Sequence, residues 1–252
     1  MLREERQAQL VRYVNSRKKA TVQELSDVLN VSKVTVRRDL DELNDAALLI
    51  KTFGGALSKD NMLTAEIPSS KKTNLCVEEK RRIGTVCAEM VEDGDVVILD
   101  SGTTTLEIAR RITEKHITVI TSDLNIAMLL APHTAVTVFL AGGIVDPNVY
   151  VTIGNEAERL FSQLYANKTF LGADALSLEH GITDRAYAQL PIKRAMLSAG
   201  QRKILAADHT KFEKEVFAQV CQLSTIDTLV TDRIDPTYQE ALQAAGVEVM
   251  LG

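Results

Sequence analysis

The sequence predicts an α/β protein, with a small N-terminal helical module followed by a hairpin and then a larger domain built on a parallel β-sheet. Apolar residues recur at helical spacing in the first sixty positions, whereas later the chain alternates short apolar runs with helix-length segments. Of the 29 Lys and Arg and the 34 Asp and Glu, 11 and 9 respectively fall in residues 1–60. The small module is therefore slightly basic, and the larger domain, with 18 basic and 25 acidic residues, is acidic.

The composition is that of an ordinary soluble protein, with 45% hydrophobic and 25% charged residues in a chain of 252. No apolar run approaches the roughly 18 residues that cross a bilayer, and the charged N-terminus does not resemble a secretory signal. We therefore expect a cytoplasmic protein without a membrane partner. Cys76, Cys87 and Cys221 are too few and too scattered for a disulfide framework or a zinc cluster, and no metal site or cofactor is expected.

Three helices are predicted in the first fifty residues. An apolar stripe at Leu10, Val11 and Val14 predicts a helix over about residues 3–16. Thr21 and Glu24 have the spacing of a capping box, so a second helix should begin there. Asn30 and Val31 form a tight break, and Ser32 is a suitable N-cap for a third helix. Val36, Leu40, Leu43 and Ala47 form the buried side of that helix.

The exposed side of the third helix carries Lys33, Val34, Thr35, Arg37 and Arg38 in its N-terminal half. A short helix, a tight turn and a helix with such a face are typical of a helix-turn-helix that enters the major groove of DNA. The segment LLIKTFGGALSK then predicts two strands around Gly54 and Gly55, flanked by Lys51 and Lys59. The alternative is a three-helix protein-interaction module with a solvated basic face.

The run from Ala20 to Asp39, which includes VSKVTVRRDL at residues 31–40, together with FGGA at residues 53–56, resembles the DNA-binding domain of the DeoR family of regulators. The chain departs from that family at residues 51–53, where Lys-Thr-Phe precedes the glycines and the family usually has Arg and His. The resemblance implies a winged helix-turn-helix domain over residues 1–57, with the helix-turn-helix at 20–39, and double-stranded operator DNA as its partner. The predicted DNA-binding residues are Thr21, Ser32, Lys33, Val34, Thr35, Arg37, Arg38, Lys51, Gly54 and Gly55.

A linker is predicted over residues 58–74, which lack periodicity and are rich in polar residues. A helix follows in which Cys87 shares an apolar face with Ile83, so this cysteine is expected in the core. Seven short apolar runs then predict a parallel sheet covered on both faces. They are Val96–Leu99, Ile117–Ile120, Val136–Leu140, Thr169–Leu171, Ile204–Ala206, Thr228–Val230 and Val247–Leu251. Asp235 and Pro236 begin the last helix, and Gly246 ends it.

Ligands of open parallel sheets bind beyond the carboxyl ends of the strands. The first predicted strand is followed by Asp100-Ser101-Gly102-Thr103-Thr104-Thr105 and a new helix, a combination of glycine, hydroxyls and helix N-terminus that suits a phosphate. The alternative is local, because Thr104 and Glu107 have the spacing of a capping box. The predicted effector-binding residues are Asp100, Ser101, Gly102, Thr103, Thr104, Thr105, Ser122, Gly142, Gly143, Asp174, Lys193, Asp208 and Lys211.

Stretches of the larger domain also resemble the DeoR sensor domain, among them DGDVVILDSGTTT at residues 93–105, FLGADALSLEHGIT at 170–183 and AADHTKF at 206–212. The resemblance implies that residues 75–252 form a sugar-phosphate-sensing domain similar to ribose-phosphate isomerases and CoA transferases. This chain has Ser122 where the family normally has Asn, a change that bears on ligand choice, and Asn167 where the family has Asp.

An enzyme is the main alternative function. Asp100, Asp174, Asp208, Lys193 and Lys211 are of the residue types that a sugar-phosphate isomerase would use, but spacing cannot show that they converge. We therefore predict a non-enzymatic transcriptional regulator. It should repress a carbohydrate catabolic operon as a homodimer or homotetramer and leave its operator when a phosphorylated sugar or sugar alcohol binds.

Overall fold

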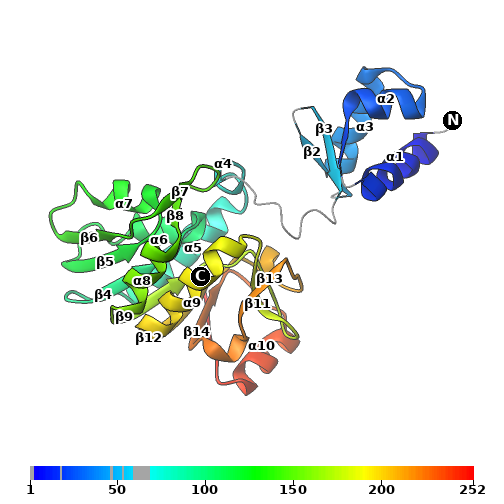
Figure 1. Ribbon diagram of the computed structural model, residues 1–252. Helices are drawn as coiled ribbons and strands as arrows, with labels where there is room; N and C mark the ends of the chain where they lie inside the picture. The colour runs from blue at the N-terminus through cyan, green and yellow to red at the C-terminus, as the bar shows by residue number, and fades with distance from the viewer. Residues whose placement is uncertain (1–2, 18, 46–47, 53, 59–68) are drawn as a thin grey trace. The chain divides into compact units, whose positions relative to one another are not determined.

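The computed structural model describes residues 3–17, 19–45, 48–52, 54–58 and 69–252 (Figure 1). The chain divides between residues 65 and 66 into two compact units. The first is the small helical module, and the second contains the parallel sheet.

The first unit contains the three predicted helices and a small sheet. In chain order its elements are α1 (Arg3–Arg17), β1 (Lys19–Thr21), α2 (Val22–Leu29), α3 (Lys33–Asp45), β2 (Leu49–Thr52) and β3 (Gly55–Ser58). The predicted capping box is present, because the Thr21 hydroxyl accepts from the Glu24 N–H and the Glu24 carboxylate accepts from the Thr21 N–H. Leu10, Leu25 and Leu40 are fully buried where the three helices meet, while the predicted core residue Ala47 lies outside the described residues.

The hairpin of the first unit is part of a three-stranded antiparallel sheet in the order β1-β3-β2. Thr52 pairs with Gly55, so Gly55 is the first residue of β3 and only Gly54 of the predicted glycine pair lies in the connection. A Cβ atom on Gly55 would lie 2.0 Å from the carbonyl oxygen of Ala20 in β1. Glycine is therefore required at position 55 by the close approach of two strands.

The second unit is built on a seven-stranded sheet in the order β15-β14-β12-β9-β4-β5-β6, with every neighbouring pair parallel. The strands are β4 (Val96–Leu99), β5 (Ile117–Thr121), β6 (Val136–Leu140), β9 (Ala166–Leu171), β12 (Gly200–Ala206), β14 (Thr228–Thr231) and β15 (Glu248–Leu251). These seven strands are the seven apolar runs of the sequence, so the predicted α/β class with a parallel sheet is confirmed. β9 and β12 each begin several residues before the predicted start.

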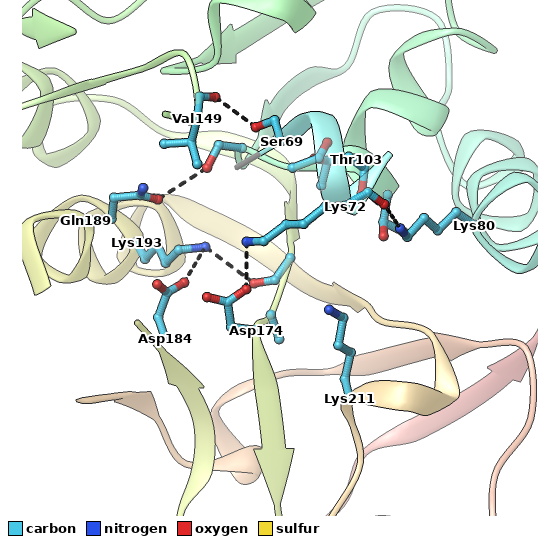
Figure 2. Close-up of a pocket in the computed structure, with 16 residues that line it drawn as sticks. Ser69, Lys72, Lys80, Thr103, Val149, Asp174, Asp184, Gln189, Lys193 and Lys211 are labelled. Atoms are coloured by element: carbon cyan, nitrogen blue, oxygen red, sulfur yellow. Dashed lines mark hydrogen bonds and ion pairs between the residues drawn. The ribbon is translucent and has the colours of Figure 1, made fainter. Parts of the chain in front are cut away.

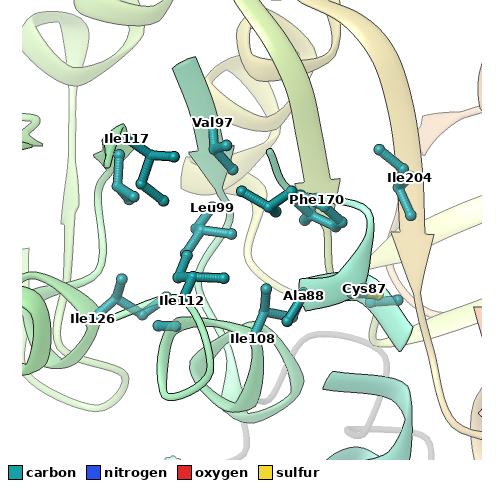
Figure 3. Packing of buried hydrophobic residues seen from close by; sticks show 14 of the residues in the cluster. Cys87, Ala88, Val97, Leu99, Ile108, Ile112, Ile117, Ile126, Phe170 and Ile204 are labelled. Atoms are coloured by element: carbon teal, nitrogen blue, oxygen red, sulfur yellow. The ribbon is translucent and has the colours of Figure 1, made fainter. Parts of the chain in front are cut away.

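Helices cover both faces of the sheet. Val97 and Leu99 of β4 pack in one cluster with Ile108 of α6, whereas Ile98 between them packs with Phe161 of α8. Figure 3 shows the first of these clusters, which includes the buried Cys87. The helices are α5 (Val77–Glu89), α6 (Thr103–Ala109), α7 (Leu124–Leu130), α8 (Asn155–Ser162), α9 (Leu190–Ala199) and α10 (Pro236–Ala244). The last helix has the predicted Asp235 N-cap.

The second unit also contains short elements that the sequence pattern does not predict. They are α4 (Ser69–Lys72), β7 (Ile144–Asp146), β8 (Val151–Ile153), β10 (Ala175–Ser177), β11 (Gly181–Asp184), η2 (Tyr187–Gln189), η3 (His209–Lys211), β13 (Ala218–Cys221) and η4 (Leu223–Thr225). β10, β11 and β13 form an antiparallel sheet, and β7 pairs with β8. Elements of three or four residues are too short for a periodic pattern to reveal them.

The prediction that residues 58–74 form a linker without regular structure is wrong for residues 69–72, which are helix α4. The N–H of Ser69 donates to the Asn148 carbonyl, and the Lys72 ammonium contacts Asp174, so this segment belongs to the second unit. Residues 59–68 of the predicted linker, and with them Lys59, lie outside the described residues.

The strand order fixes where a ligand can bind. The chain runs from β4 to β5 and β6 on one side, and β9 then lies on the other side of β4. The order of strands therefore reverses between β4 and β9, and ligands of open α/β sheets bind beyond the carboxyl ends at such a point. The loop at residues 100–105 follows β4, and Gly172 follows β9.

Candidate functional site

Helix α3 presents a polar, exposed surface opposite the buried Val36, Leu40 and Leu43. Lys33, Val34, Arg37 and Arg38 are exposed, and Thr35 is half-buried. Val34 is 73% exposed, and an apolar side chain at such a position can contact the methyl group of a thymine in the major groove.

Asp39 has a different role from the two arginines that precede it. Its side chain is 2% exposed and accepts from Arg6 Nε at 2.6 Å and from Arg6 Nη2 at 3.0 Å. This paired contact joins α1 to α3 and is strong because both groups are charged. Sequence patterns do not reveal the pair, since the two residues lie 33 positions apart.

Several predicted DNA-binding residues also make contacts that shape the module. Ser32 caps α3, its hydroxyl accepting from the Thr35 N–H at 3.2 Å. The carbonyl of Gly54 accepts from the Val22 N–H at 2.8 Å and ties the hairpin to α2. Lys51 forms an ion pair with Asp41, so it must exchange that partner before it can hold a DNA phosphate. The ten predicted DNA contacts stay predictions.

A pocket lies at the carboxyl edge of the large sheet, where β4 and β9 end (Figure 2). Its empty volume is about 620 Å³ with the open mouth included. It is lined by Ser69, Lys72, Lys80, Ser101, Gly102, Thr103, Thr104, Thr105, Val149, Gly172, Ala173, Asp174, Asp184, Gln189, Lys193 and Lys211. Eight of these were predicted from the sequence: Ser101, Gly102, Thr103, Thr104, Thr105, Asp174, Lys193 and Lys211.

The loop after β4 forms one wall of the pocket. Gly102 is the N-cap of α6 and has a φ of 143°, a backbone conformation that glycine adopts most readily. The alternative that Thr104 and Glu107 form a capping box is therefore wrong; Glu107 instead pairs with Arg111 at 2.7 Å. The hydroxyls of Thr103 and Thr104 have no hydrogen-bond partner among the described residues, and both side chains line the pocket.

Lys193 lies at the floor of the pocket between two carboxylates. Its ammonium is 2.5 Å from Asp100 Oδ2 and 3.3 Å from Asp184 Oδ2, and all three side chains are buried. Burial alone would lower the pKa of Lys193, but the two aspartates outweigh burial and raise it. Lys193 therefore stays charged. Asp100 also accepts from the Gly172 N–H at 2.9 Å, which joins the loops after β4 and β9.

Asp174 lines the pocket three residues after the end of β9. Lys72 Nζ is 2.8 Å from one of its oxygens, and Arg185 Nη1 is 3.2 Å from the other. Burial acts to raise the pKa of Asp174, yet Lys72 and Arg185 outweigh burial and hold the pKa below its usual range. The carboxylate is thus ionised and can accept hydrogen bonds from ligand hydroxyls.

Helix α4 closes one side of the pocket and is held by Lys80 of α5. The Lys80 ammonium donates to the carbonyls of Lys72 and Leu75 at 2.7 and 2.6 Å. The Ser69 hydroxyl donates to the Val149 carbonyl at 3.3 Å. Burial lowers the pKa of Lys80, because carbonyl dipoles compensate its lost hydration less fully than a carboxylate would.

Lys211, at the end of η3, points toward Asp174 and Lys72 in Figure 2. No acceptor in the described ranges lies within hydrogen-bond distance of its ammonium. Burial lowers the pKa of this lysine, while the nearby Asp208 and Asp174 act to raise it. Lys211 is partly buried, and a cation in this setting without a direct partner is costly, so a bound anion at this position would be stabilised.

Five of the predicted effector-binding residues do not line the pocket. Asp100 lies beneath it, paired with Lys193, and Asp208 caps η3 by accepting from the Thr210 N–H at 3.0 Å. Ser122 is buried and uses its carbonyl to accept from Thr152. Gly142 and Gly143 follow the end of β6, where Gly143 makes a close approach to Ile153.

Eight residues of the pocket are not among the predicted effector-binding residues: Ser69, Lys72, Lys80, Gly172, Ala173, Val149, Asp184 and Gln189. Gly172 and Ala173 follow β9 directly, so the strand-end rule already points to them. The others are carried by α4, α5, β11 and η2 or lie between β7 and β8, where no rule about parallel strands applies.

The helix-turn-helix geometry and this pocket agree with the matches to known families. The DeoR-like helix-turn-helix domain matches residues 6–62, and the DeoR C terminal sensor domain matches residues 75–233. The chain belongs to the DeoR family of transcriptional regulators. Among similar proteins, the HTH-type transcriptional repressor GlcR of Bacillus subtilis (strain 168) is 31% identical over 253 residues, which cover 100% of this chain and 97% of GlcR.

The lactose phosphotransferase system repressor of Staphylococcus epidermidis is 31% identical to this DeoR-family chain over 242 residues, covering 94% of each. Ribose 5 phosphate isomerase A from Neisseria gonorrhoeae is a partial structural neighbour, with a TM-score of 0.39, 18% identity and coverage of 53% of this chain and 52% of that one. None of the helices in the described ranges is long and apolar enough to cross a membrane.

Proposed function

We propose that this DeoR-family chain represses a carbohydrate catabolic operon and leaves the operator when a phosphorylated sugar or sugar alcohol occupies the pocket at the carboxyl edge of the sheet. The observation that carries the proposal is the combination of groups in that pocket. Two hydroxyls and a cation, none with a direct partner among the described residues, face the same space as an ionised carboxylate. The name of the similar Staphylococcus epidermidis protein, a lactose phosphotransferase system repressor, supports the carbohydrate assignment.

The phosphate would bind at the loop after β4. Thr103 and Thr104 offer hydroxyls there, and the first N–H groups of a helix have no carbonyl partner within the helix. Lys211 would supply the compensating charge. Asp174 would accept hydrogen bonds from the sugar hydroxyls, which a phosphate alone does not offer. The domain as a whole is acidic, so an anion enters only because cations gather in this pocket.

Release from DNA would be transmitted through α4. This helix is the first element of the second unit, and the Lys72 ammonium lies 2.8 Å from Asp174. A phosphate that attracts Lys72 competes with Asp174 for the same ammonium, so the position of α4 depends on whether the pocket is filled. The same helix leads back along the chain to the DNA-binding unit. Ligand binding and DNA binding are then coupled with equal strength in both directions.

Thermal shift and operator release test the proposal. Sugar phosphates should raise the melting temperature of the full chain and release labelled operator, whereas their parent sugars should bind far more weakly. Thr104→Val keeps the side-chain shape but removes a hydroxyl, and the loss of one hydrogen bond to a charged group costs about 1.5–3 kcal/mol. We expect this variant to need at least about tenfold more ligand for release while binding operator normally.

Thr118→Val is the matched control. Thr118 lies in the amino-terminal half of β5, away from the carboxyl edge, and the same change there should leave the ligand response unaltered. Equal responses to a sugar and its phosphate would show that the loop after β4 does not bind phosphate. Normal release by the Thr104→Val variant would lead to the same conclusion.

A further inference from the structure

Half of the large apolar side chains exposed in the described part of the second unit are concentrated in one stretch. They are Met128, Phe139, Leu140, Ile144, Val145 and Tyr150. Ile144 is 71% exposed and Met128 is 75% exposed, so both are mostly in water in a single chain. Exposed apolar residues scattered singly are normal, but six of them within residues 128–150 mark a candidate interaction site.

The same stretch is almost free of charge. Residues 124–155 contain one charged residue, Asp146, although 25% of the whole chain is charged. Depletion of charged residues distinguishes the core of a protein interface from the rest of a surface. Solvent exposure alone does not account for a segment that is both exposed and uncharged, because exposed segments are normally kept soluble by charge.

The strand β6 in this stretch is an edge of the seven-stranded sheet, as Figure 1 shows. Its sequence VTVFL contains neither a proline nor a lysine, the residues that usually protect an edge. Phe139 and Leu140 project to opposite faces of the sheet, yet they are 48% and 42% exposed. The chain therefore leaves this strand incompletely covered on both faces and at its edge.

We propose that the surface formed by α7, β6 and β7 is where a second copy of this chain binds. An edge strand can pair with the same strand of another copy across a two-fold axis, which makes the surface self-complementary. The chain carries a net charge of −5, so two copies repel one another where acidic surface meets acidic surface. The uncharged stretch is where this repulsion is smallest, and its residues are enough for the 20–30 or so on each side of a standard interface.

This assignment adds to the proposed function and rests on it for one point. Two DNA-binding units are needed to bind the two half-sites of an operator. The location of the surface itself follows from burial, charge and strand order. A different protein as partner would normally be selected by charged residues at the rim, and this stretch offers one.

Sedimentation velocity of the full chain at micromolar concentration, without DNA or effector, tests the proposal. Wild type should be a dimer or a larger oligomer. Ile144→Lys combined with Met128→Lys would bury two charges on each partner, and we expect the self-association constant of this variant to fall about 30-fold or more, as for loss of a hot spot. Both side chains are exposed in the single chain, so the melting temperature measured on monomer should change little.

Leu251→Lys is the matched control, because Leu251 is 61% exposed on β15, the opposite edge of the same sheet. This control should associate as wild type does. A monomeric wild type, an oligomer that survives the double substitution, or dissociation by Leu251→Lys would overturn the assignment. Oligomer size is measured without ligand, so the result does not depend on whether a sugar phosphate releases the operator.

Discussion

Three consecutive residues of α3, Arg37, Arg38 and Asp39, differ in burial and therefore in role. Arg37 and Arg38 are exposed, and Arg38 makes a 3.6 Å contact with Glu42 while remaining 78% exposed. Asp39 is buried against Arg6 of α1. These consecutive charged residues therefore have two roles. The arginines form a surface available to DNA, and the aspartate forms a buried ion pair that holds α3 against α1. The helical period separates them, since one side of α3 faces α1 and the other faces solvent.

These two roles predict different effects of Arg6→Ala and Arg38→Ala on the stability of the DNA-binding unit. Arg6→Ala leaves the buried Asp39 carboxylate unpaired and should destabilise the DNA-binding unit by about 3–5 kcal/mol, seen as faster hydrogen exchange in α1 and α3. Arg38→Ala should change that stability by less than about 0.5 kcal/mol, because its pair is exposed.

Operator titration completes the comparison. If Arg38 reads a base, Arg38→Ala should weaken specific binding by about 1–3 kcal/mol. If it contacts a phosphate, binding to all DNA should weaken and the dependence on salt should flatten. Normal operator affinity in the double Arg37→Ala, Arg38→Ala variant would exclude α3 as the recognition helix.

At the scale of elements, short segments decide the shape of both units. The hairpin β2–β3 is locked to the helices through β1, where Gly55 meets Ala20 with no room for a side chain. In the second unit, α4 is one helical turn, yet it contributes Ser69 and Lys72 to the pocket. Both depend on contacts with segments distant in the sequence.

The two neighbouring glycines of the hairpin should respond differently to alanine. Gly55→Ala forces the new methyl group against the Ala20 carbonyl and should destabilise the DNA-binding unit by more than about 1 kcal/mol and weaken operator binding. Gly54→Ala is the control, since nothing lies within 4 Å of its Cβ position. Hydrogen exchange in β1 and β3 would report the difference, and equal protection in both variants would contradict the steric argument.

At the scale of the whole molecule, the second unit contains every residue of the pocket only when α4 is included. A fragment of residues 66–252 should be stabilised by a sugar phosphate as the full chain is, whereas residues 75–252 lack Ser69 and Lys72 and should bind it at least about tenfold more weakly. Neither fragment should bind operator.

Lys72→Met in the full chain distinguishes a lost contact from a damaged fold. The change should weaken ligand binding, and it should also alter operator affinity in the absence of ligand, because α4 loses its ion pair with Asp174. Lys168→Met is a suitable control, as it removes a comparable ion pair with Asp95 at the opposite end of β9. Ligand binding by residues 75–252 equal to that of residues 66–252 would remove α4 from the site.

The sequence by itself determined the seven parallel strands, the three N-terminal helices, the caps of α2 and α3, the burial of Cys87 and the loop that follows β4. Each of these depends on local periodicity, on a capping residue or on the rule that loops follow strands. The tertiary structure alone decided that Asp39 forms an ion pair with Arg6 of α1 and that Thr104 lines a pocket and does not cap α6. It also decided that Lys72 and Asp184 line the same pocket. These features depend on pairs of residues far apart in the chain, such as Lys72 with Asp174, and only packing brings such pairs together.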